Sequence, residues 1–349
     1  MVMVARARNL PSSAADLLES EAKKIFKKSQ DDSHEISTSD PLLQWFDNRS
    51  ALTIRNIEQR ARKLLLHNDL SSQNMELNRY SCLASNLYVA LFNACRILTK
   101  PFRSSNPTWL RLPKDSEVKL EISASELLAA VSFQIANIAK GLRLSNLEEI
   151  TSAHSSIFVG DSTSFVKESS VDLILTSPPY CTRIDYTAAT RVELALIAPM
   201  LSLSREELSR DMVGSVRVPK AVSEPQVYWG ETCNNFIAAL RSHSSKASSG
   251  YYYKTHIDYF DKMSRSMKKL YKNLKNGGGA VMVVQDSFYK DIHNDVPTIL
   301  TEMAQLEGLN MYRRVDFLQR NSISGINSKS RKYSKPAGPI ETVICFLKN

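Results

Sequence analysis

The hydrophobic pattern changes at about residue 147, and this change limits the possible folds more than any other feature of the sequence. Beyond it, short apolar runs alternate with longer stretches of helical periodicity, as a parallel sheet with crossover helices requires. The predicted strands are Ser156–Val159, Val171–Leu175, Ala280–Val284, Tyr312–Phe317 and Thr342–Phe346. The C-terminal part of the chain is therefore expected to form an α/β doubly wound sheet.

The second and third predicted strands are about a hundred residues apart, which is too long for a simple connection. A helix is predicted from about Tyr259 to Lys275, ending at Gly277–Gly279, because glycine after a helix adopts positive φ without steric cost. The interval of roughly 182–265 contains the serine-rich tract Ser242–Gly250. We expect this interval to be an insertion that contains a mobile loop near the active site.

Before residue 147 the periodicity is helical. Ile54, Ile57 and Ala61 recur at spacings of three and four residues, as the buried face of a helix does. The pattern predicts an N-terminal helix and polar linker over residues 1–40, then a helical insertion over 41–147 that is a candidate for target recognition. The catalytic region is expected over residues 148–349.

Composition narrows the classes of partner. The formal net charge of the 349 residues is +9, which favours a polyanion such as DNA, although a solvated basic surface explains the charge equally well. The five cysteines show no CxxC spacing and the six histidines no paired spacing, so reduced thiols and no metal are expected. No apolar run is long enough for a membrane span, so no membrane is expected and the predicted location is cytoplasmic.

The second predicted strand runs into Thr176–Tyr180, which has the sequence TSPPY. In a doubly wound sheet the carboxyl ends of the strands form the ligand crevice, so this loop is expected at the functional site. The two prolines have no N–H and a fixed φ, which leaves the carbonyl groups of Ser177 and Pro178 as rigid acceptors. Such acceptors suit an exocyclic base amine, because hydrogen bonds from its protons help the nitrogen attack a methyl group. Tyr180 offers a flat face for an extruded base.

On these residues the chain resembles the amino-methylating DNA methyltransferases, whose catalytic motif is (D/N/S)PP(Y/F). The resemblance implies a Rossmann-like class I methyltransferase fold, S-adenosyl-L-methionine as cofactor and double-stranded DNA as substrate. It implies catalytic roles for Ser177, Pro178, Pro179 and Tyr180. The Ser form of the motif is more typical of N4-cytosine enzymes, so site-specific methylation of cytosine N4 is expected, within a restriction-modification setting. Methylation of adenine N6 is the alternative.

Other stretches follow the family's order. Phe158–Ser162 resembles the strand-end element whose acid contacts the cofactor adenine, and the resemblance assigns Asp161, Ser162 and Thr176 to cofactor binding. Two further matches are Ile184–Tyr186, like the stretch after the catalytic loop, and Leu274–Val284 with Asp286 and Ser287, like the family's helix, glycine turn and strand. The resemblance therefore extends from about residue 156 to the end.

One part of the family pattern has no counterpart. The family's cofactor loop has the form FxGxG at the start of a helix, whereas the first glycine here is Gly141 and the cluster Gly277–Gly279 follows a predicted helix. The strand that ends in a ribose-binding acid is also missing, and Val2–Arg8 resembles the start of the helix that comes after that strand. The expected sheet is thus incomplete at its N-terminal strands. An ordinary flexible tail is the alternative interpretation of residues 1–8.

In the family, the missing strands lie between the strand of Phe158 and the strand of Ile174. Both neighbours would expose unpaired backbone and apolar side chains. We therefore expect a second polypeptide that supplies the FxGxG segment, and a truncated gene product is the alternative. Contacts to the DNA target are expected from the helical insertion, from the interval 182–265, or from the basic loop Arg320–Lys335.

A function from another class stays open: a non-catalytic DNA-binding remnant that keeps the base pocket and has lost its cofactor site. The intact Thr176–Tyr180 motif disfavours it. RNA methylation is disfavoured because the sequence shows no RNA-binding module. Cys181, next to the motif, is interpreted as a packing residue, since amine methylation needs no cysteine nucleophile.

Overall fold

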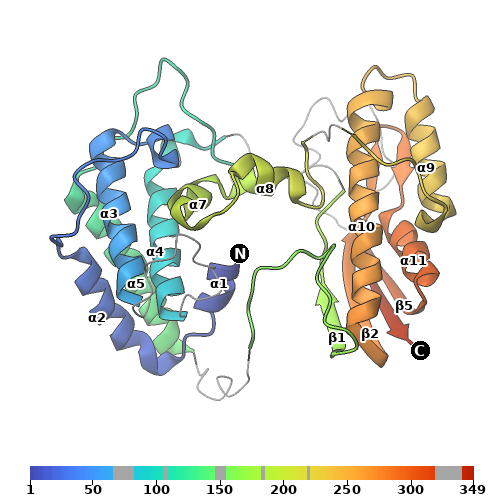
Figure 1. The fold of residues 1–349 in the computed structure, drawn as a ribbon, viewed down its shortest axis with the longest axis horizontal. Helices are drawn as coiled ribbons and strands as arrows, with labels where there is room; N and C mark the ends of the chain where they lie inside the picture. Colours follow the sequence, from blue (N-terminus) through green and yellow to red (C-terminus); the bar gives the residue numbers. More distant parts are fainter. Residues whose placement is uncertain (66–81, 105–108, 146–154, 182–184, 218–220, 319–339) are drawn as a thin grey trace. The chain divides into compact units, whose positions relative to one another are not determined.

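The chain forms two compact units. The computed structural model describes residues 1–349 except 66–81, 105–108, 146–154, 182–184, 218–220 and 319–339. The helical unit contains residues 1–159 and 187–205, and the sheet unit contains residues 160–186 and 206–349 (Figure 1). The first forty residues and a short piece from the C-terminal part of the chain therefore belong to the helical unit.

The helical unit is built from amphipathic helices. Its principal helices are α1 (Val2–Ala7), α2 (Ala15–Phe26), α3 (Asn48–Leu65), α4 (Cys82–Leu98), α5 (Ala124–Leu144) and α7 (Arg191–Leu196), and the short α6 (Tyr186–Ala189) spans the unit boundary. On α2 the buried residues are Ala15, Leu18, Ala22 and Ile25, which is the three- and four-residue spacing of one helix face. The predicted face of α3 is likewise buried at Ile54, Ile57 and Ala61.

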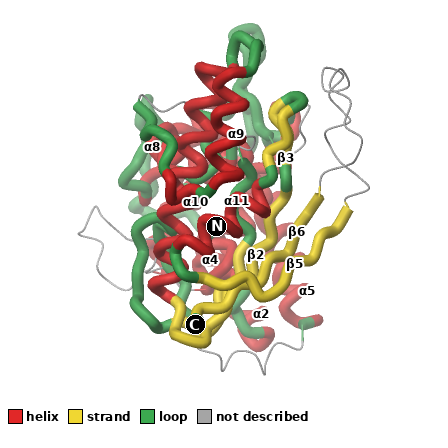
Figure 2. The backbone as a smooth tube through the Cα atoms, turned by 90° about the vertical axis from the view of Figure 1, so that its right-hand side faces the viewer, coloured by secondary structure: helices red, strands yellow, loops and turns green. Residues whose placement is uncertain are grey.

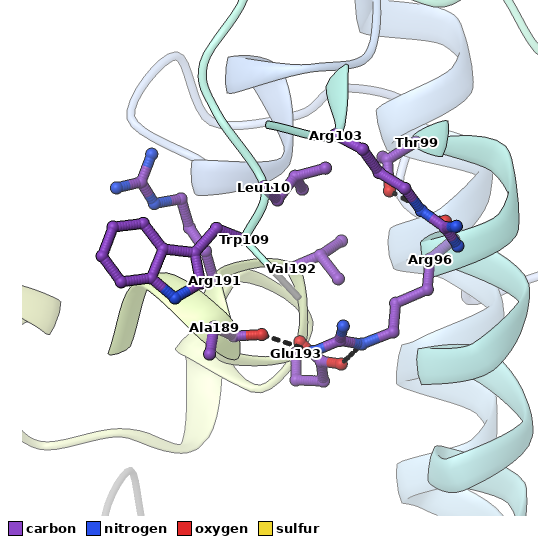
Figure 3. A pocket seen from close by; sticks show the side chains of 9 residues that line it. All are labelled: Arg96, Thr99, Arg103, Trp109, Leu110, Ala189, Arg191, Val192 and Glu193. Carbon is purple, nitrogen blue, oxygen red and sulfur yellow. Dashed lines mark hydrogen bonds and ion pairs between the residues drawn. The ribbon is translucent and has the colours of Figure 1, made fainter. Parts of the chain in front are cut away.

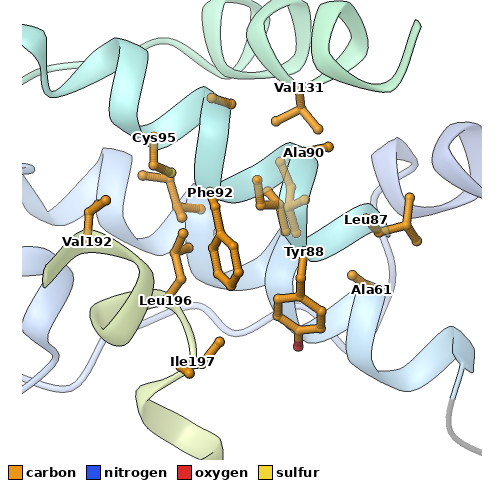
Figure 4. Close-up of a cluster of buried hydrophobic side chains, with 14 of the residues drawn as sticks. Ala61, Leu87, Tyr88, Ala90, Phe92, Cys95, Val131, Val192, Leu196 and Ile197 are labelled. Atoms are coloured by element: carbon orange, nitrogen blue, oxygen red, sulfur yellow. The ribbon is translucent and has the colours of Figure 1, made fainter. Parts of the chain in front are cut away.

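The core of this unit gathers around α4. Tyr88 and Phe92 on α4 and Leu196 on α7 belong to one hydrophobic cluster (Figure 4), and all three side chains are buried. The Tyr88 hydroxyl donates a hydrogen bond of 2.7 Å to Glu58 Oε1, which gives the buried phenol a partner. Segments far apart in the sequence thus share one apolar interior.

An arginine fastens residues 187–205 to α3. Arg55 forms two hydrogen bonds with the Asp40 carboxylate, at 2.9 and 3.0 Å. It also donates to the carbonyl oxygens of Leu196 and Ala195, at 2.7 and 3.0 Å. The planar guanidinium can serve a carboxylate and two carbonyls at once, so this contact explains why a segment of the C-terminal region joins the helical unit.

The long helix α5 begins with a capping box. Ser123 accepts from the amide of Glu126 at 3.2 Å, and the Glu126 carboxylate accepts from the amide of Ser123 at 2.8 Å. By length and composition alone, α5 is apolar enough to cross a membrane. Its buried residues Leu127, Val131 and Ile135 belong to the core of the helical unit, whereas Phe133 and Leu144 are exposed.

The sheet unit contains a mixed four-stranded sheet in the order β1-β2-β6-β5. The strands are β1 (Val171–Thr176), β2 (Leu274–Gln285), β5 (Leu309–Leu318) and β6 (Ile340–Lys348), and a hairpin adds β3 (Ser287–Tyr289) and β4 (Ile292–Asn294). β1 pairs with β2 in parallel, whereas β6 is antiparallel to both of its neighbours. Four of the five predicted strands are present, but the parallel pairing that the pattern predicts is limited to one pair.

Helices cover one face of this sheet. They are α9 (Glu231–Ser242), α10 (Tyr253–Asn273) and α11 (Val296–Leu306), while α8 (Arg205–Asp211) precedes them in the chain. Figure 2 shows α9, α10 and α11 gathered on the same side of the strands. The strand residues on that side are buried with the helices, among them Ala280, Met282, Val284, Ile344 and Phe346.

The opposite face of the sheet is apolar but poorly covered. Two rows of residues that are paired across neighbouring strands form this face. One row is Leu175, Val281 and Cys345, and the other is Val283, Val343 and Val315. Leu173 and Leu175 are 62% and 75% exposed, and the valines and Cys345 are half-buried. A doubly wound sheet has helices on both faces. Among the residues that the structure describes, the sheet unit has them on one.

The predicted strand Ser156–Val159 is absent. Residues 155–160 have no regular structure, and the carbonyl of Ile157 instead accepts a 2.6 Å hydrogen bond from Arg6 of α1. Phe158 and Val159 are 44% and 56% exposed. The apolar run is typical of a strand, but a strand needs a neighbour to receive its backbone hydrogen bonds, and no described strand is paired with it.

The glycine cluster does not terminate the helix. α10 ends at Asn273, and Gly277–Gly279 lie inside β2. The register with β1 jumps from Val171↔Leu274 to Leu173↔Gly279, so the glycines form an irregularity opposite the start of β1. Gly277 has a φ of 77°, which glycine alone adopts without cost.

Gly278→Ala should destabilise the sheet unit. A Cβ at this position would lie 2.9 Å from the carbonyl oxygen of Lys275 and 3.1 Å from that of Asp172, and backbone atoms cannot move away cheaply. We expect the free energy of unfolding to fall by about 1–3 kcal/mol, measured by urea denaturation. Gly250→Ala, in the same unit and with no atom within 4 Å of the added Cβ, is the control and should change it by less than about 0.5 kcal/mol. Equal effects would contradict a steric role for Gly278.

Candidate active site

The TSPPY loop borders an apolar cavity of about 330 Å³ at the carboxyl end of β1. Its walls come from the loop, from α10 and from the segment before β1. The lining residues are Ser162, Phe165, Ile174, Thr176, Ser177, Pro178, Pro179, Val213, Met263, Ser266, Met267, Lys269, Leu270, Asn273 and Met282. The cavity therefore brings together five of the seven residues assigned to the site from the sequence. Asp161 and Tyr180 are the two that do not line it.

The carbonyl groups of the loop differ in their partners. Pro179 accepts a 3.1 Å hydrogen bond from the hydroxyl of Tyr259, a fully buried residue of α10. Among the residues that the structure describes, none donates a hydrogen bond to the carbonyl of Ser177 or Pro178. One carbonyl thus anchors the loop, and the described part of the chain provides no donor for the other two.

Tyr180 lies at the edge of the site. Its side chain is 38% exposed, and its main chain is held on both sides. Burial raises the pKa of Tyr186, and a hydrogen bond with the backbone of Tyr180 partly opposes that rise. On the other side, Gly214 approaches so closely that a Cβ there would lie 2.7 Å from the carbonyl oxygen of Tyr180. Of the predicted stretch Ile184–Tyr186, position 184 lies outside the described residues.

The carboxylate of Asp161 is hydrogen-bonded within its own turn. It accepts hydrogen bonds from the amide and hydroxyl of Thr163, both at 2.8 Å, and from Ser164 Oγ at 3.2 Å. Burial acts to raise the pKa of Asp161, but these hydrogen bonds and the charge of Arg265 outweigh it and hold the pKa below the ordinary value. The neighbouring Ser162 is the residue that reaches the cavity, where its hydroxyl lies 3.0 Å from that of Ser266 on α10.

The end of α10 shapes the cavity floor. Asn273 accepts a hydrogen bond from the amide of Lys167 and donates one of 3.3 Å to the carbonyl of Phe165. The amide of Ser170 donates to the carbonyl of Asn273 at 3.0 Å. These bonds tie the segment before β1 to the helix and hold Phe165 at the cavity.

Sequence reasoning missed the contribution of α10. Met263, Met267 and Leu270 line the cavity together with Asn273. Their spacing of three and four residues marks one face of a helix that leads directly into β2, which is the signal that could have identified them. Cys181 is 4% exposed and belongs to the core of the sheet unit, as its interpretation as a packing residue predicts.

A second, smaller cavity of about 20 Å³ lies within the helical unit (Figure 3). Arg96, Arg103 and Arg191 line it together with Trp109 and Glu193. Arg96 pairs with Glu193 and donates to the carbonyl of Ala189. The volume suits about one water molecule, so this is not a pocket for an organic ligand. Arg103 is exposed and makes no ion pair with any described residue.

Metal ligands do not cluster in the part of the chain that the structure describes: it contains no group of three or more His, Cys, Asp or Glu placed to hold an ion. The basic loop Arg320–Lys335 lies outside the described residues. The serine-rich tract Ser242–Gly250, part of the interval predicted to contain a mobile loop, forms the end of α9, a turn and the start of a π-helical segment with Ser248 buried.

Comparison with known proteins gives partial matches. No protein-family model matches the chain. Over 153 residues it is 27% identical to the Type II methyltransferase M.AvaI of Nostoc sp. (strain PCC 7120 / SAG 25.82 / UTEX 2576), and equally to the protein of that name from Anabaena variabilis. Part of this chain is similar to a Type II methyltransferase. The match covers 40% of the chain and 31% of each relative, so the chain spans less than a third of the length of these relatives.

Two crystal structures of a Thermus thermophilus protein, described as a DNA modification methylase, are also similar. The sequence identities are 15% and 16%, and the match covers 54% of this chain and 50% and 52% of the other. Both TM-scores are 0.26, which is too low for an inference about shared fold.

The turn at Asp161 should make stability depend on pH. Because the folded-state pKa lies below the ordinary value of about 3.9, the carboxylate stabilises the protein above that value, and the effect is lost as the pH falls through the folded pKa. The difference in melting temperature between wild type and Asp161→Asn should therefore be largest near neutral pH and shrink as the pH falls from about 5 to about 3. Glu168→Gln, in the same segment and exposed, is the matched control at each pH. A difference that stays constant with pH would contradict the assigned role of the carboxylate.

Proposed function

We propose that this chain is part of an S-adenosyl-L-methionine-dependent DNA methyltransferase that modifies the N4 amine of cytosine at specific sites. The observation that carries the proposal is the Thr176–Tyr180 loop at the carboxyl end of β1 beside an apolar cavity, where no described residue donates a hydrogen bond to the carbonyl groups of Ser177 and Pro178. The partial similarity to a Type II methyltransferase supports the same reaction class.

The proposed reaction gives the loop three roles: to accept the protons of the amine, to keep the turn rigid and to stack on the base. The carbonyl oxygens of Ser177 and Pro178 accept the protons of the exocyclic amine, which directs the nitrogen lone pair out of the base plane. Pro179 fixes the turn, and its own carbonyl is held by Tyr259, so the two acceptors cannot rotate away. Tyr180 stacks on the extruded base. With a bound methyl donor, the amine held by these groups would accept the methyl group and release one proton to solvent.

S-adenosyl-L-methionine, when bound, supplies an electrophilic methyl group. A cavity of about 330 Å³ with Phe165, Met263 and Met267 in its walls is at the small end of the range for ligand pockets and fits the flat, apolar part of such a cofactor. Thr176 and Ser162 provide polar groups at its edge. Asp161 belongs to this set only if its carboxylate exchanges a hydrogen bond within its turn for one to the cofactor.

A second polypeptide is the proposed partner. Within the described residues β1 pairs on one edge only, with β2, and Leu173 and Leu175 are exposed on the uncovered face of the sheet. Unpaired strand edges and exposed apolar faces seek partners. We propose that the partner adds its strand to β1, covers this face and supplies the FxGxG loop of the cofactor site.

Contacts to double-stranded DNA are proposed for the helical unit. The net charge of +9 favours a polyanion, and the exposed Arg103, beside Trp109 and Arg191, suits a backbone phosphate. The proposed location is the cytoplasm, and the proposed biological setting is restriction-modification. No metal is required.

Two other functions compete. Adenine N6 methylation uses the same carbonyl acceptors, and the Ser in first place of the motif is the feature that favours cytosine. A non-catalytic DNA-binding remnant would need no acceptors, so carbonyl groups of Ser177 and Pro178 that accept from no described residue favour a catalytic loop.

The direct test is the methylated base itself. The full chain is expressed together with the adjacent upstream reading frame in a host that lacks its own DNA methylation, and the nucleosides of the host DNA are measured by mass spectrometry. We expect N4-methylcytosine. N6-methyladenine would assign the alternative substrate, and the absence of both, with soluble proteins present, would favour the remnant.

Tyr180→Ala tests the stacking role of the loop in the same assay. Stacking on an extruded base is made only in the catalytic complex and is worth roughly 1–3 kcal/mol, whereas phosphate contacts set most of the DNA affinity. Methylation should therefore fall about 5- to 150-fold while DNA affinity measured by gel shift stays nearly constant. An equal loss of both would identify the loop as a structural element.

Partner dependence is a separate prediction. The chain alone should aggregate or self-associate and bind S-adenosyl-L-methionine weakly, and the upstream polypeptide should restore solubility and binding measured by calorimetry. Leu173→Lys, on the uncovered face, should weaken the association. Val227→Lys, at a position that is 92% exposed in the same unit, should not. A monodisperse monomer that binds the cofactor tightly without a partner would contradict the proposal.

A further inference from the structure

Lys262 is a buried lysine that holds the segment next to the TSPPY loop. It lies on α10 and is 8% exposed. Its ammonium group donates hydrogen bonds to the carbonyl of Arg210 at 2.7 Å, to the carbonyl of Met212 at 3.3 Å and to Asp258 at 2.9 Å. A buried lysine is costly unless its charge is paired, and here all three donors have partners.

Lys262 thus holds the segment at Arg210 and Met212. Two residues after Met212, this segment contacts the carbonyl of Tyr180. Val213 lines the cavity. Gly214 has a φ of 77° and lies against the Tyr180 carbonyl. A Cβ added to Gly214 would lie 3.4 Å from the Cβ of Pro179. The π-helical turn before α10 fixes the far end, since the Tyr251 hydroxyl donates to the carbonyl of Val216 at 2.9 Å. The segment from 210 to 216 is thus fastened at both ends, with its middle on the catalytic loop.

α10 also holds the loop directly, through the bond from Tyr259 to the carbonyl of Pro179. Tyr259 and Lys262 are three residues apart and lie on the same side of the helix. One helix therefore fixes Pro179 from one direction and, through Gly214, the Tyr180 peptide from another.

We propose that Lys262 is a positioning residue for Tyr180: it holds Gly214 against the Tyr180 carbonyl and so keeps the aromatic ring in the orientation that receives the extruded base. The catalytic consequence rests on the proposed methyltransferase function. The contact itself does not.

The test compares Lys262→Met with Lys268→Met, which removes the same charge from an exposed position of α10. Tyr251→Phe is a milder variant that removes one hydroxyl and preserves the fold if Lys262→Met does not. Hydrogen exchange measured by mass spectrometry should be faster in peptides covering 178–181 and 206–217 in Lys262→Met, and in the second peptide in Tyr251→Phe. Lys268→Met should match wild type.

The activity arm uses the full chain with the polypeptide that completes it. Because small misplacements of catalytic groups are costly, Lys262→Met should lower kcat about tenfold or more and leave the KM for DNA within about twofold. Combined with Tyr180→Ala, it should cause no further loss, since both substitutions remove the same stacking contact.

The exchange and the kinetic results test different parts of the proposal: the positioning of Tyr180 by Lys262 and its consequence for methylation. Unchanged exchange at 178–181 in Lys262→Met together with unchanged exchange at 206–217 in Tyr251→Phe overturns the proposal. So do losses of kcat that add fully in the double variant, because Lys262 would then act independently of Tyr180. If wild type shows no methylation with its partner, the proposed function fails, and the exchange result alone decides whether Lys262 positions Tyr180.

Discussion

The parallel pairing of β1 with β2 is the interaction on which the site depends. It fixes the direction of β1, so that Thr176 and the following prolines emerge beside α10, the helix that leads into β2. The same pairing uses only one edge of β1 within the described residues. The strand that leads into the TSPPY loop therefore also has an edge with no described partner and an apolar face with exposed side chains, and the proposed catalysis and the proposed association are expected to be linked through it.

The helix α10 acts on the loop in more ways than as a cover for the sheet. It supplies the apolar wall through Met263 and Met267, an anchor through Tyr259, and a fastening for the 210–216 segment through Lys262. These four residues recur along one helix at spacings that place them on neighbouring faces. A rigid helix positions a loop more reliably than another loop would, which explains how a short proline-rich turn keeps a defined geometry next to an open sheet edge.

The local sequence pattern was enough to predict the strands β1, β2, β5 and β6 and the position of the motif. Short apolar runs and prolines at strand ends are features of neighbouring residues, so they can be recognised without the fold. It failed at Phe158, whose apolar run resembled a strand but has no described neighbour to pair with, and at Gly277–Gly279, which belong to β2 instead of a helix end. The hydrogen bond from Lys262 to Arg210 joins residues about fifty positions apart, and nothing in the local sequence encodes such a pair. The sites of failure are thus those where long-range contacts decide the structure.

The sheet face that no described helix covers and the carbonyl groups that accept from no described residue have a common physical meaning. Both are surfaces that cost free energy when left as they are, the first through exposed apolar area and the second through acceptors that would be desolvated in a closed site without donors. In the proposed function, a base amine would satisfy the carbonyl groups of Ser177 and Pro178, and a partner would cover Leu173 and Leu175, which are exposed. Because β1 carries both, a partner that stiffens β1 also reduces the motion of the loop, and association then lowers the entropic cost of binding the base. Completion of the sheet and organisation of the active site are, on this view, one event.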